Sequence, residues 1–279
     1  MICAITGSSG VLGSYIIKNN PKVKFLKFKG DISNEIEIKN WILKKKFHVF
    51  LHLAAIVSTT EIKKNYKLAK KVNYYANKNI VNTLLLKENV FFFYASSSHV
   101  YPSSLKKLRE NTKPKPLTIY GRLKYSSEKY ILKKFKNTKN NYCIGRIFSF
   151  THHTQKKTFL IPGVYEKIKI SRNNKEIDFK DTNHNRDFVS IKDINSCIFF
   201  LLKNKAGGIY NIASGKKINL QYLIKIICKK FNKIPKFLAN KNSTTLIANI
   251  SKIKKIGWRP KDDIVKILKD YELSKNFKY

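Results

Sequence analysis

Tyr120 and Lys124 are the two side chains whose types and spacing best suit acid–base chemistry. Residues four apart lie on one face of an α-helix, so the phenol and the ammonium are expected to be neighbours. A tyrosine that exchanges a proton near neutral pH needs its pKa lowered by about 3 units, or ~4 kcal/mol. A lysine charge ~4 Å away supplies about that amount at an effective dielectric of ~20. The pair therefore predicts proton transfer to or from an alcohol or a ketone.

A serine cluster precedes this pair in the run Ala95-Ser96-Ser97-Ser98-His99-Val100-Tyr101. We expect Ser97 to end a buried strand and to hydrogen-bond the reacting oxygen, holding it toward Tyr120. Read alone, the cluster is also compatible with an ordinary turn. Its place between a glycine-rich turn and the Tyr-Lys helix makes the catalytic interpretation specific.

The glycine-rich turn, Gly7-Ser8-Ser9-Gly10-Val11-Leu12-Gly13, lies between a predicted strand at 2–6 and a predicted helix at 11–18. Glycines there permit a tight turn and a close approach of backbone to a pyrophosphate, and the helix N-terminus offers free N–H groups. The turn predicts a dinucleotide site. The residues expected to bind the cofactor are Gly7, Ser9, Gly10, Val11, Leu12 and Gly13.

Downstream, Asp31 is placed to accept a hydrogen bond from an adenine amino group, although aspartate also serves as a helix N-cap. No acidic residue for the ribose hydroxyls of NAD is evident at the end of the second strand. Lys27 and Lys29 stand there instead, which gives a slight preference for NADP over NAD.

Short apolar runs alternate with longer mixed segments, a pattern typical of a parallel sheet covered by helices. Beyond the first strand and helix, we expect strands at 23–28, 49–53, 90–95, 142–148 and 208–212, and helices at 35–46, 68–87, 220–231 and 264–271. The fold class is α/β, a doubly wound parallel sheet of Rossmann type with a smaller C-terminal α/β substrate lobe. We predict a dinucleotide-binding domain at 1–146, rejoined by about 186–204, and a mainly substrate-binding lobe at 147–279.

The formal net charge of +40 suggests nucleic acid as a partner, but the positive charge is mostly lysine spread along the chain. This spread, beside abundant Asn and Ile, indicates an A- and T-rich coding sequence rather than a dedicated binding face. Nucleic acid is therefore not expected, and a non-catalytic dinucleotide-binding protein with a basic, polyanion-binding surface is the remote alternative. With no basic leader and no apolar run near ~18 residues, we expect no membrane association and a cytoplasmic protein. The four scattered cysteines predict neither disulfides nor a metal site.

The order of these motifs resembles the extended short-chain dehydrogenase/reductase family over nearly the whole chain, in its nucleotide-sugar epimerase, dehydratase and reductase branch. The resemblance also rests on Gly30-Asp31-Ile32, His52-Leu53-Ala54-Ala55, Asn73, Glu128, Arg146, Arg186-Asp187-Phe188-Val189, the run 210–215 and the run 256–260. It implies NAD or NADP as cofactor, with Ile32, Leu53, Ala54, Ala55, Tyr120 and Lys124 among its contacts. It further implies a nucleotide-sugar substrate, a contact of Arg186 with the substrate diphosphate, and a homodimer through the 68–87 and 120–136 helices.

Ser98 and His99 stand where 4,6-dehydratases of this family carry an acidic pair, so a dehydratase is not expected. We predict that Ser98 and His99 contact the substrate instead, together with Ser149, which replaces a usual asparagine. Two reactions remain open. The first is reduction of a nucleotide-linked 4-keto-6-deoxy sugar with Tyr120 as proton donor, and the alternative is 4-epimerisation with a retained NAD.

Overall fold

The computed structural model describes residues 1–138, 140–171, 175–239 and 243–275. The chain forms two compact units. Unit 1 comprises Met1–Pro102, Glu110–Ile147 and Ile194–Ile212, and unit 2 comprises Ser103–Arg109, Phe148–Asp193 and Ala213–Tyr279. Assigning dinucleotide binding and substrate binding to separate domains stays a prediction.

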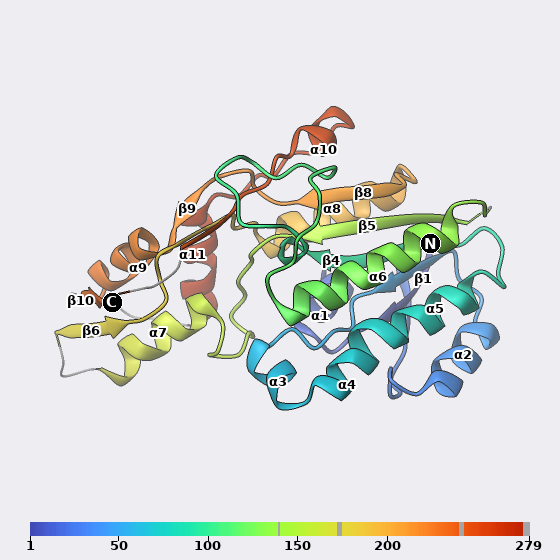
Figure 1. Cartoon of the computed structure of the whole chain (residues 1–279), viewed down its shortest axis with the longest axis horizontal. Coiled ribbons are helices and arrows are strands. Elements are labelled where there is room, and N and C mark those ends of the chain that lie inside the picture. Colours follow the sequence, from blue (N-terminus) through green and yellow to red (C-terminus); the bar gives the residue numbers. More distant parts are fainter. Residues whose placement is uncertain (139, 172–174, 240–242, 276–279) are drawn as a thin grey trace. The chain divides into compact units, whose positions relative to one another are not determined.

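Unit 1 is built on a six-stranded sheet with the order β2-β1-β3-β4-β5-β8, in which all neighbouring strands are parallel (Figure 1). The strands are β1 (Ile2–Thr6), β2 (Lys24–Lys27), β3 (Val49–His52), β4 (Phe91–Ser97), β5 (Asn141–Ile147) and β8 (Gly208–Ile212). The helices are α1 (Val11–Asn19), α2 (Glu35–Lys44), α3 (Thr59–Lys64), α4 (Tyr66–Lys70), α5 (Ala76–Leu84), α6 (Ile119–Phe135) and α8 (Ile191–Lys203). The prediction of a doubly wound parallel sheet is confirmed.

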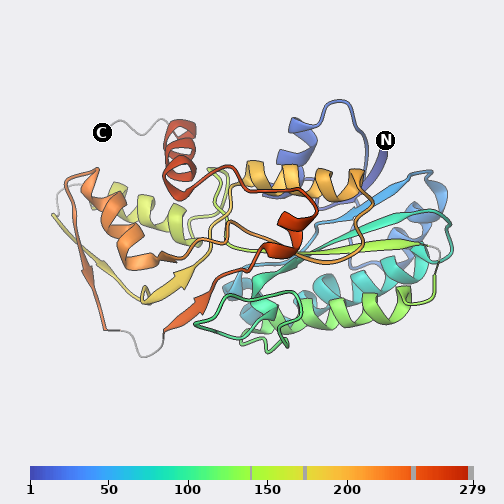
Figure 2. The same ribbon diagram turned by 90° about the horizontal axis from the view of Figure 1, so that it is seen from above.

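Helices cover both faces of this sheet. For this reason strands such as Val49–His52 are buried along their whole length. On one face, Phe50, Phe92 and Ile144 pack with Ile38 of α2 and Ile80 of α5, in a core that also includes Ile131 and Phe135 of α6. On the other face lie α1 and α8, as Figure 2 shows. Asn20, after α1, donates to Asn195 of α8 at 2.8 Å.

The prediction of a single helix at 68–87 is wrong in detail. The structure has α4, then a π-helical turn at Lys71–Tyr75, then α5. The side chain of Asn73, in the π turn, accepts from the Ile56 N–H and donates to the Ile56 C=O, both at 2.8 Å. This local tie, not visible as a helix breaker in the sequence, fixes the segment after β3. A homodimer through this region stays a prediction.

Unit 2 has two small sheets and its own core. The sheets are β10–β6 and β11–β7–β9. Their strands are β6 (Glu176–Phe179), β7 (His184–Arg186), β9 (Ile218–Asn219), β10 (Ile234–Phe237) and β11 (Thr244–Leu246), and the helices are α7 (Leu160–Ile170), α9 (Leu220–Lys229), α10 (Ser251–Lys255) and α11 (Ile264–Ser274). The core packs Tyr165 of α7, Ile224 of α9 and Tyr271 of α11 together.

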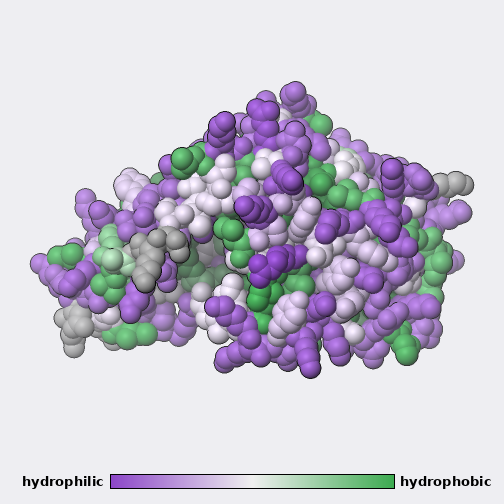
Figure 3. Space-filling model, viewed as in Figure 1, coloured by the Kyte–Doolittle hydropathy of each residue, from purple (hydrophilic) through white to green (hydrophobic). Residues whose placement is uncertain are grey.

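The surface carries the charge of the chain. On the face seen in Figure 3, hydrophilic side chains predominate and hydrophobic ones are scattered among them. Within the described residues, no helix is long and apolar enough to cross a membrane. The four cysteines are buried free thiols. A cytoplasmic location stays a prediction.

Candidate active site

The predicted cofactor residues gather where parallel strands end, because the carboxyl ends of such strands meet at one edge of the sheet. Gly7 follows β1 with φ +73°, a left-handed conformation that favours glycine. A Cβ on Gly7 would lie 2.6 Å from the Ala54 nitrogen, and one on Gly13 would lie 2.1 Å from the Gly7 oxygen. The turn, α1 and the segment after β3 therefore pack backbone against backbone.

Helix α1 begins after Gly10, and no side chain among the described residues caps its N-terminus. The uncapped N–H groups at this end, in Val11, Leu12 and Gly13, are suited to binding an anion. The glycine cradle and these N–H groups fit the pyrophosphate of a dinucleotide.

From the sequence, Asp31, which follows β2, was expected either to contact adenine or to cap the next helix. Asp31 does not cap α2, because Asn34 does so by accepting from the Glu37 N–H at 3.2 Å. The Asp31 carboxylate instead accepts from the N–H and the hydroxyl of Ser33 at 2.8 and 2.9 Å. Asp31 is exposed, and its contact with adenine stays a prediction. The contact of Ile32 with the cofactor also stays a prediction.

Thr6 and His52 tie the glycine-rich turn to the segment containing Leu53, Ala54 and Ala55. The Thr6 hydroxyl lies 2.7 Å from His52 Nδ1 and accepts from the Ala54 N–H at 3.4 Å. The two contacts hold the end of β1 against the end of β3. Burial, with the nearby charge of Lys124, lowers the pKa of His52 to about 3, so this imidazole is neutral near pH 7.

The predicted catalytic side chains converge. Ser97, at the end of β4, lies near the Tyr120 hydroxyl and acts to lower its pKa. Lys124 is 2 % exposed and donates from Nζ to the Ala95 carbonyl oxygen at 2.7 Å. Its Nζ lies 4.7 Å from the Tyr94 ring centroid and 5.8 Å from that of Tyr120.

The electrostatics of this group differ from the sequence-based expectation. Burial raises the pKa of Tyr120 above its ordinary value, and Ser97 acts in the opposite direction. Burial also lowers the pKa of Lys124 to about 7, while the Glu128 charge raises it. The expectation that Lys124 by itself lowers the pKa of Tyr120 is therefore wrong for the polypeptide, because desolvation is the larger effect.

The start of α6 presses Tyr120 against the serine cluster. Thr118 caps the helix by accepting from the Gly121 N–H at 3.0 Å. A Cβ on Gly121 would lie 2.1 Å from the His99 carbonyl oxygen, so only glycine permits this approach. The rings of His99 and Tyr120 meet edge to face with centroids 5.8 Å apart. His99 thus lies beside Tyr120, and Ser98, one residue earlier, is buried.

Arg186 and Ser149, the other predicted substrate contacts, belong to unit 2. Arg186 donates to the carbonyl oxygens of Asn185 and Thr244, each at 2.9 Å, and to the Thr244 hydroxyl at 2.9 Å. Burial lowers its pKa to about 10, so it remains charged at neutral pH. Among the described residues, no carboxylate forms an ion pair with it. The backbone of Ser149 bonds to Asp187 and Val189, which leaves its side-chain role a prediction.

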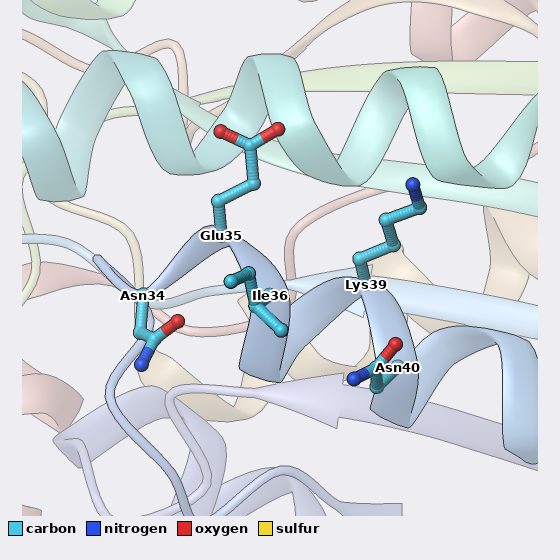
Figure 4. A pocket seen from close by; sticks show the side chains of 5 residues that line it. All are labelled: Asn34, Glu35, Ile36, Lys39 and Asn40. Carbon is cyan, nitrogen blue, oxygen red and sulfur yellow. The ribbon is translucent and has the colours of Figure 1, made fainter.

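A hollow of about 460 Å³ lies elsewhere in unit 1, on the first turns of α2 (Figure 4). Its lining, Asn34, Glu35, Ile36, Lys39 and Asn40, contains none of the predicted catalytic groups. The chemistry is therefore better sought at the strand ends.

Sequence reasoning assigned no role to several residues that shape the site. Thr6 and His52 join the cofactor turn to β3, Gly121 permits the approach of Tyr120, and Glu128 contacts two strands. A glycine directly after the tyrosine was the one available signal for close packing. The partners of a buried histidine or glutamate depend on contacts between distant residues, which a single sequence does not show.

Comparison with known proteins agrees with this arrangement. Residues 3–213 match the NAD dependent epimerase/dehydratase family. The chain is 25% identical over 293 residues to the ADP-L-glycero-D-manno-heptose-6-epimerase of Brachyspira hyodysenteriae, covering 91% of each chain. A solved UDP-glucose 4-epimerase of Thermotoga maritima with UDP-glucose superposes with a TM-score of 0.86 at 19% identity, over 99% of this chain and 100% of that one. RMD from Pseudomonas aeruginosa complexed with NADPH gives a TM-score of 0.84 at 20% identity, over 98% and 100%. With its family motifs in order from the glycine-rich turn to the Tyr-Lys helix, the chain belongs to the NAD dependent epimerase/dehydratase family, within the extended short-chain dehydrogenases/reductases.

Proposed function

We propose that this protein is a nucleotide-sugar epimerase that inverts one carbinol carbon by transient oxidation, with Tyr120 as the acid–base group. The observation that carries the proposal is the convergence of Ser97, Tyr120 and Lys124 at the carboxyl end of β4. The epimerase is preferred over the reductase first expected from the sequence because the relative that covers 91% of the chain is named an epimerase.

In this proposal, Ser97 and Tyr120 bind the hydroxyl of the reacting carbon, and Tyr120 takes its proton and later returns one. A bound nicotinamide dinucleotide supplies the hydride acceptor and donor. Since burial raises the pKa of Tyr120, nearby positive charge is needed to make it a base, and the Lys124 ammonium supports that role. Inversion requires the oxidised sugar to present its other face before it is reduced.

Arg186 is proposed to hold the diphosphate of the substrate. Its guanidinium is partly buried, charged and oriented by carbonyl oxygens rather than neutralised by a carboxylate. Two parallel N–H donors suit a phosphate. Ser98, His99 and Ser149 are proposed to contact the sugar or the phosphates.

The test is to supply purified protein with ADP-linked heptoses and UDP-linked hexoses, with NAD or NADP, and to detect epimers by NMR. Epimer formation without net change in reduced cofactor, abolished in Tyr120→Phe, supports the proposal. Product that forms only as reduced cofactor is consumed would instead identify a reductase.

The reductase stays the second candidate, because one structural neighbour, RMD from Pseudomonas aeruginosa, is complexed with NADPH, a hydride donor. Lys27, at the end of β2, and Lys29 are exposed and can pair with the additional phosphate of NADP. We therefore also propose a preference for NADP over NAD. Fluorescence titrations of the Lys27→Gln/Lys29→Gln variant with NADPH and NADH test this preference. The expected result is weaker binding of NADPH and little change in the binding of NADH.

A further inference from the structure

Glu128 lies on the same face of α6 as Tyr120 and Lys124, since the three are spaced four residues apart. It is fully buried. Ser96 and Arg146 stand opposite each other in the parallel β4–β5 ladder, and both reach this one carboxylate. Ser96 Oγ donates to Glu128 Oε1 at 2.5 Å, Arg146 Nε to Oε1 at 3.0 Å, and Arg146 Nη2 to Oε2 at 2.7 Å.

The residue before Ser97 and the helix that carries Tyr120 and Lys124 are therefore joined through a single side chain. Tyr94 and Ser96 alternate with Ala95 along β4, so their side chains share one face of the sheet. On that face Lys124 lies over the Tyr94 ring and Glu128 bonds to Ser96. A shift of α6 along β4 would break both contacts together.

The charges alternate along this line. Lys124 and Arg146 are buried basic side chains. Glu128 lies four residues after Lys124 and forms an ion pair with Arg146. Arg146 is further held by the Glu110 carbonyl oxygen at 3.0 Å and the Tyr101 ring at 4.7 Å. Among the residues that the structure describes, Tyr94, Tyr120 and the neutral His52 also lie near Lys124, and none of the three supplies a negative charge at neutral pH.

We propose that Glu128 is the positioning residue of this site: its carboxylate fixes the reactive face of α6 against the end of β4 and is the counter-charge that favours the protonated form of Lys124. The proposal rests on the proposed function only in that Tyr120 and Lys124 perform the chemistry. A purely structural ion pair would stabilise the fold without controlling the charge of Lys124, and buried ion pairs are weak evidence of stability by themselves.

The positioning role and a purely structural ion pair predict different changes in the pKa of Lys124. Glu128→Gln removes the negative charge, so the pKa of Lys124 should fall below its value of about 7. Arg146→Gln removes the competing positive charge, so the same pKa should rise. The shift expected in Glu128→Gln is about 1–3 units, the usual effect of one nearby opposite charge.

Lys124 can be followed by NMR in protein with ¹³C-labelled lysine, because ordinary lysines titrate near ~10.4. Lys124→Met identifies its signal. Opposite shifts in the two variants support the proposal, and equal, same-direction or absent shifts overturn it. The measurement needs neither sugar nor cofactor, so it stays decisive even if the protein epimerises none of the sugars tested.

Two further variants complete the test. Where a single charge variant fails to fold, Glu128→Gln/Arg146→Gln removes both charges, and the Lys124 midpoint should still fall, because Glu128 is on the helix that carries Lys124. An unchanged midpoint there overturns the proposal. Ser96→Ala leaves the charges in place and breaks the strand contact, so it should lower kcat with an unchanged KM and an unmoved Lys124 titration. A wild-type kcat would overturn the positioning role.

Discussion

The strand ends of unit 1 and the β7–β11 edge of unit 2 hold their polar groups in different ways. In unit 1, Lys124 and Glu128 are almost fully buried and bonded to side chains or backbone of β4. In unit 2, Arg186 is only partly buried, and its donors are directed by the carbonyl oxygens of Asn185 and Thr244. Burial lowers the pKa of Lys124 to about 7, whereas the partly buried Arg186, whose pKa is lowered to about 10, keeps its charge at neutral pH.

This difference separates chemistry from recognition. A proton-transfer group needs a protonation state set by its surroundings, which burial provides. A group proposed to bind phosphate needs its own charge and a fixed orientation. Backbone carbonyl oxygens orient the Arg186 guanidinium without neutralising its charge. Variants in the two places should therefore fail in different kinetic parameters.

The largest effect is expected for Tyr120→Phe. It removes the hydroxyl near Ser97 while keeping the ring beside His99. We expect kcat to fall by about 10²–10⁴-fold with KM little changed, as for loss of a general acid–base group. Steady-state kinetics measure this, and an unaltered circular dichroism melt serves as the control. A wild-type kcat would mean that Tyr120 is not the acid–base group.

Arg186→Met should act on binding instead. Losing a charged hydrogen-bonding partner for the diphosphate should raise the substrate KM by about 10–100-fold, with a kcat close to wild type. Arg186→Lys, which keeps the charge but loses the paired donors, should fall between the two. A drop in kcat at constant KM would contradict the assignment of recognition to this edge.

Gly13→Ala and Gly10→Ala form a matched pair at the cofactor turn. The added methyl would lie 2.1 Å from the Gly7 oxygen in the first variant and 3.3 Å in the second. Displacement of the turn should weaken dinucleotide binding by about tenfold in Gly13→Ala and only slightly in Gly10→Ala. Fluorescence titration with NADH and NADPH measures both. Equal affinities in the two variants would show that the turn does not bind the cofactor.

The sheet of unit 1 could be predicted because its strands contain short apolar runs separated by helical segments. The strand at Gly208–Ile212 and the site order from Gly7 to Lys124 were readable in the same way. The short strands of unit 2, such as His184–Arg186, are polar and pair with distant segments, so no local periodicity reveals them. The π turn at Lys71–Tyr75 was equally hidden, because it depends on the contact of Asn73 with Ile56.

Electrostatics were the least predictable part of the site. The spacing of Tyr120 and Lys124 indicated the right helix face but not how deeply it is buried. Burial depends on the Gly121 approach to His99 and on the Glu128 contacts, both of which join residues distant in sequence. The direction of the pKa of Tyr120 was therefore wrong when judged from the neighbouring charge alone.

The last prediction concerns stability rather than kinetics, at His52, whose ring joins the glycine-rich turn to β3. Its pKa is about 3 in the fold and ~6.5 when unfolded, so the unfolded chain binds more protons between these values. Its contribution to stability is complete above pH ~6.5 and is lost as the pH falls toward about 3, at up to ~1.4 kcal/mol per pH unit. In His52→Asn, whose amide can still hydrogen-bond with Thr6, urea unfolding across this range should depend less on pH. An identical pH dependence would mean that His52 is not buried as a neutral ring.

The most direct test of the central claim follows a nucleotide sugar that carries deuterium at the inverted carbon, in ordinary water. If the carbon is inverted by oxidation and re-reduction at one site, the epimer keeps its deuterium and Tyr120→Phe yields none. Replacement of the label by solvent hydrogen would contradict this mechanism, because it would mean that a proton, rather than a hydride, leaves that carbon.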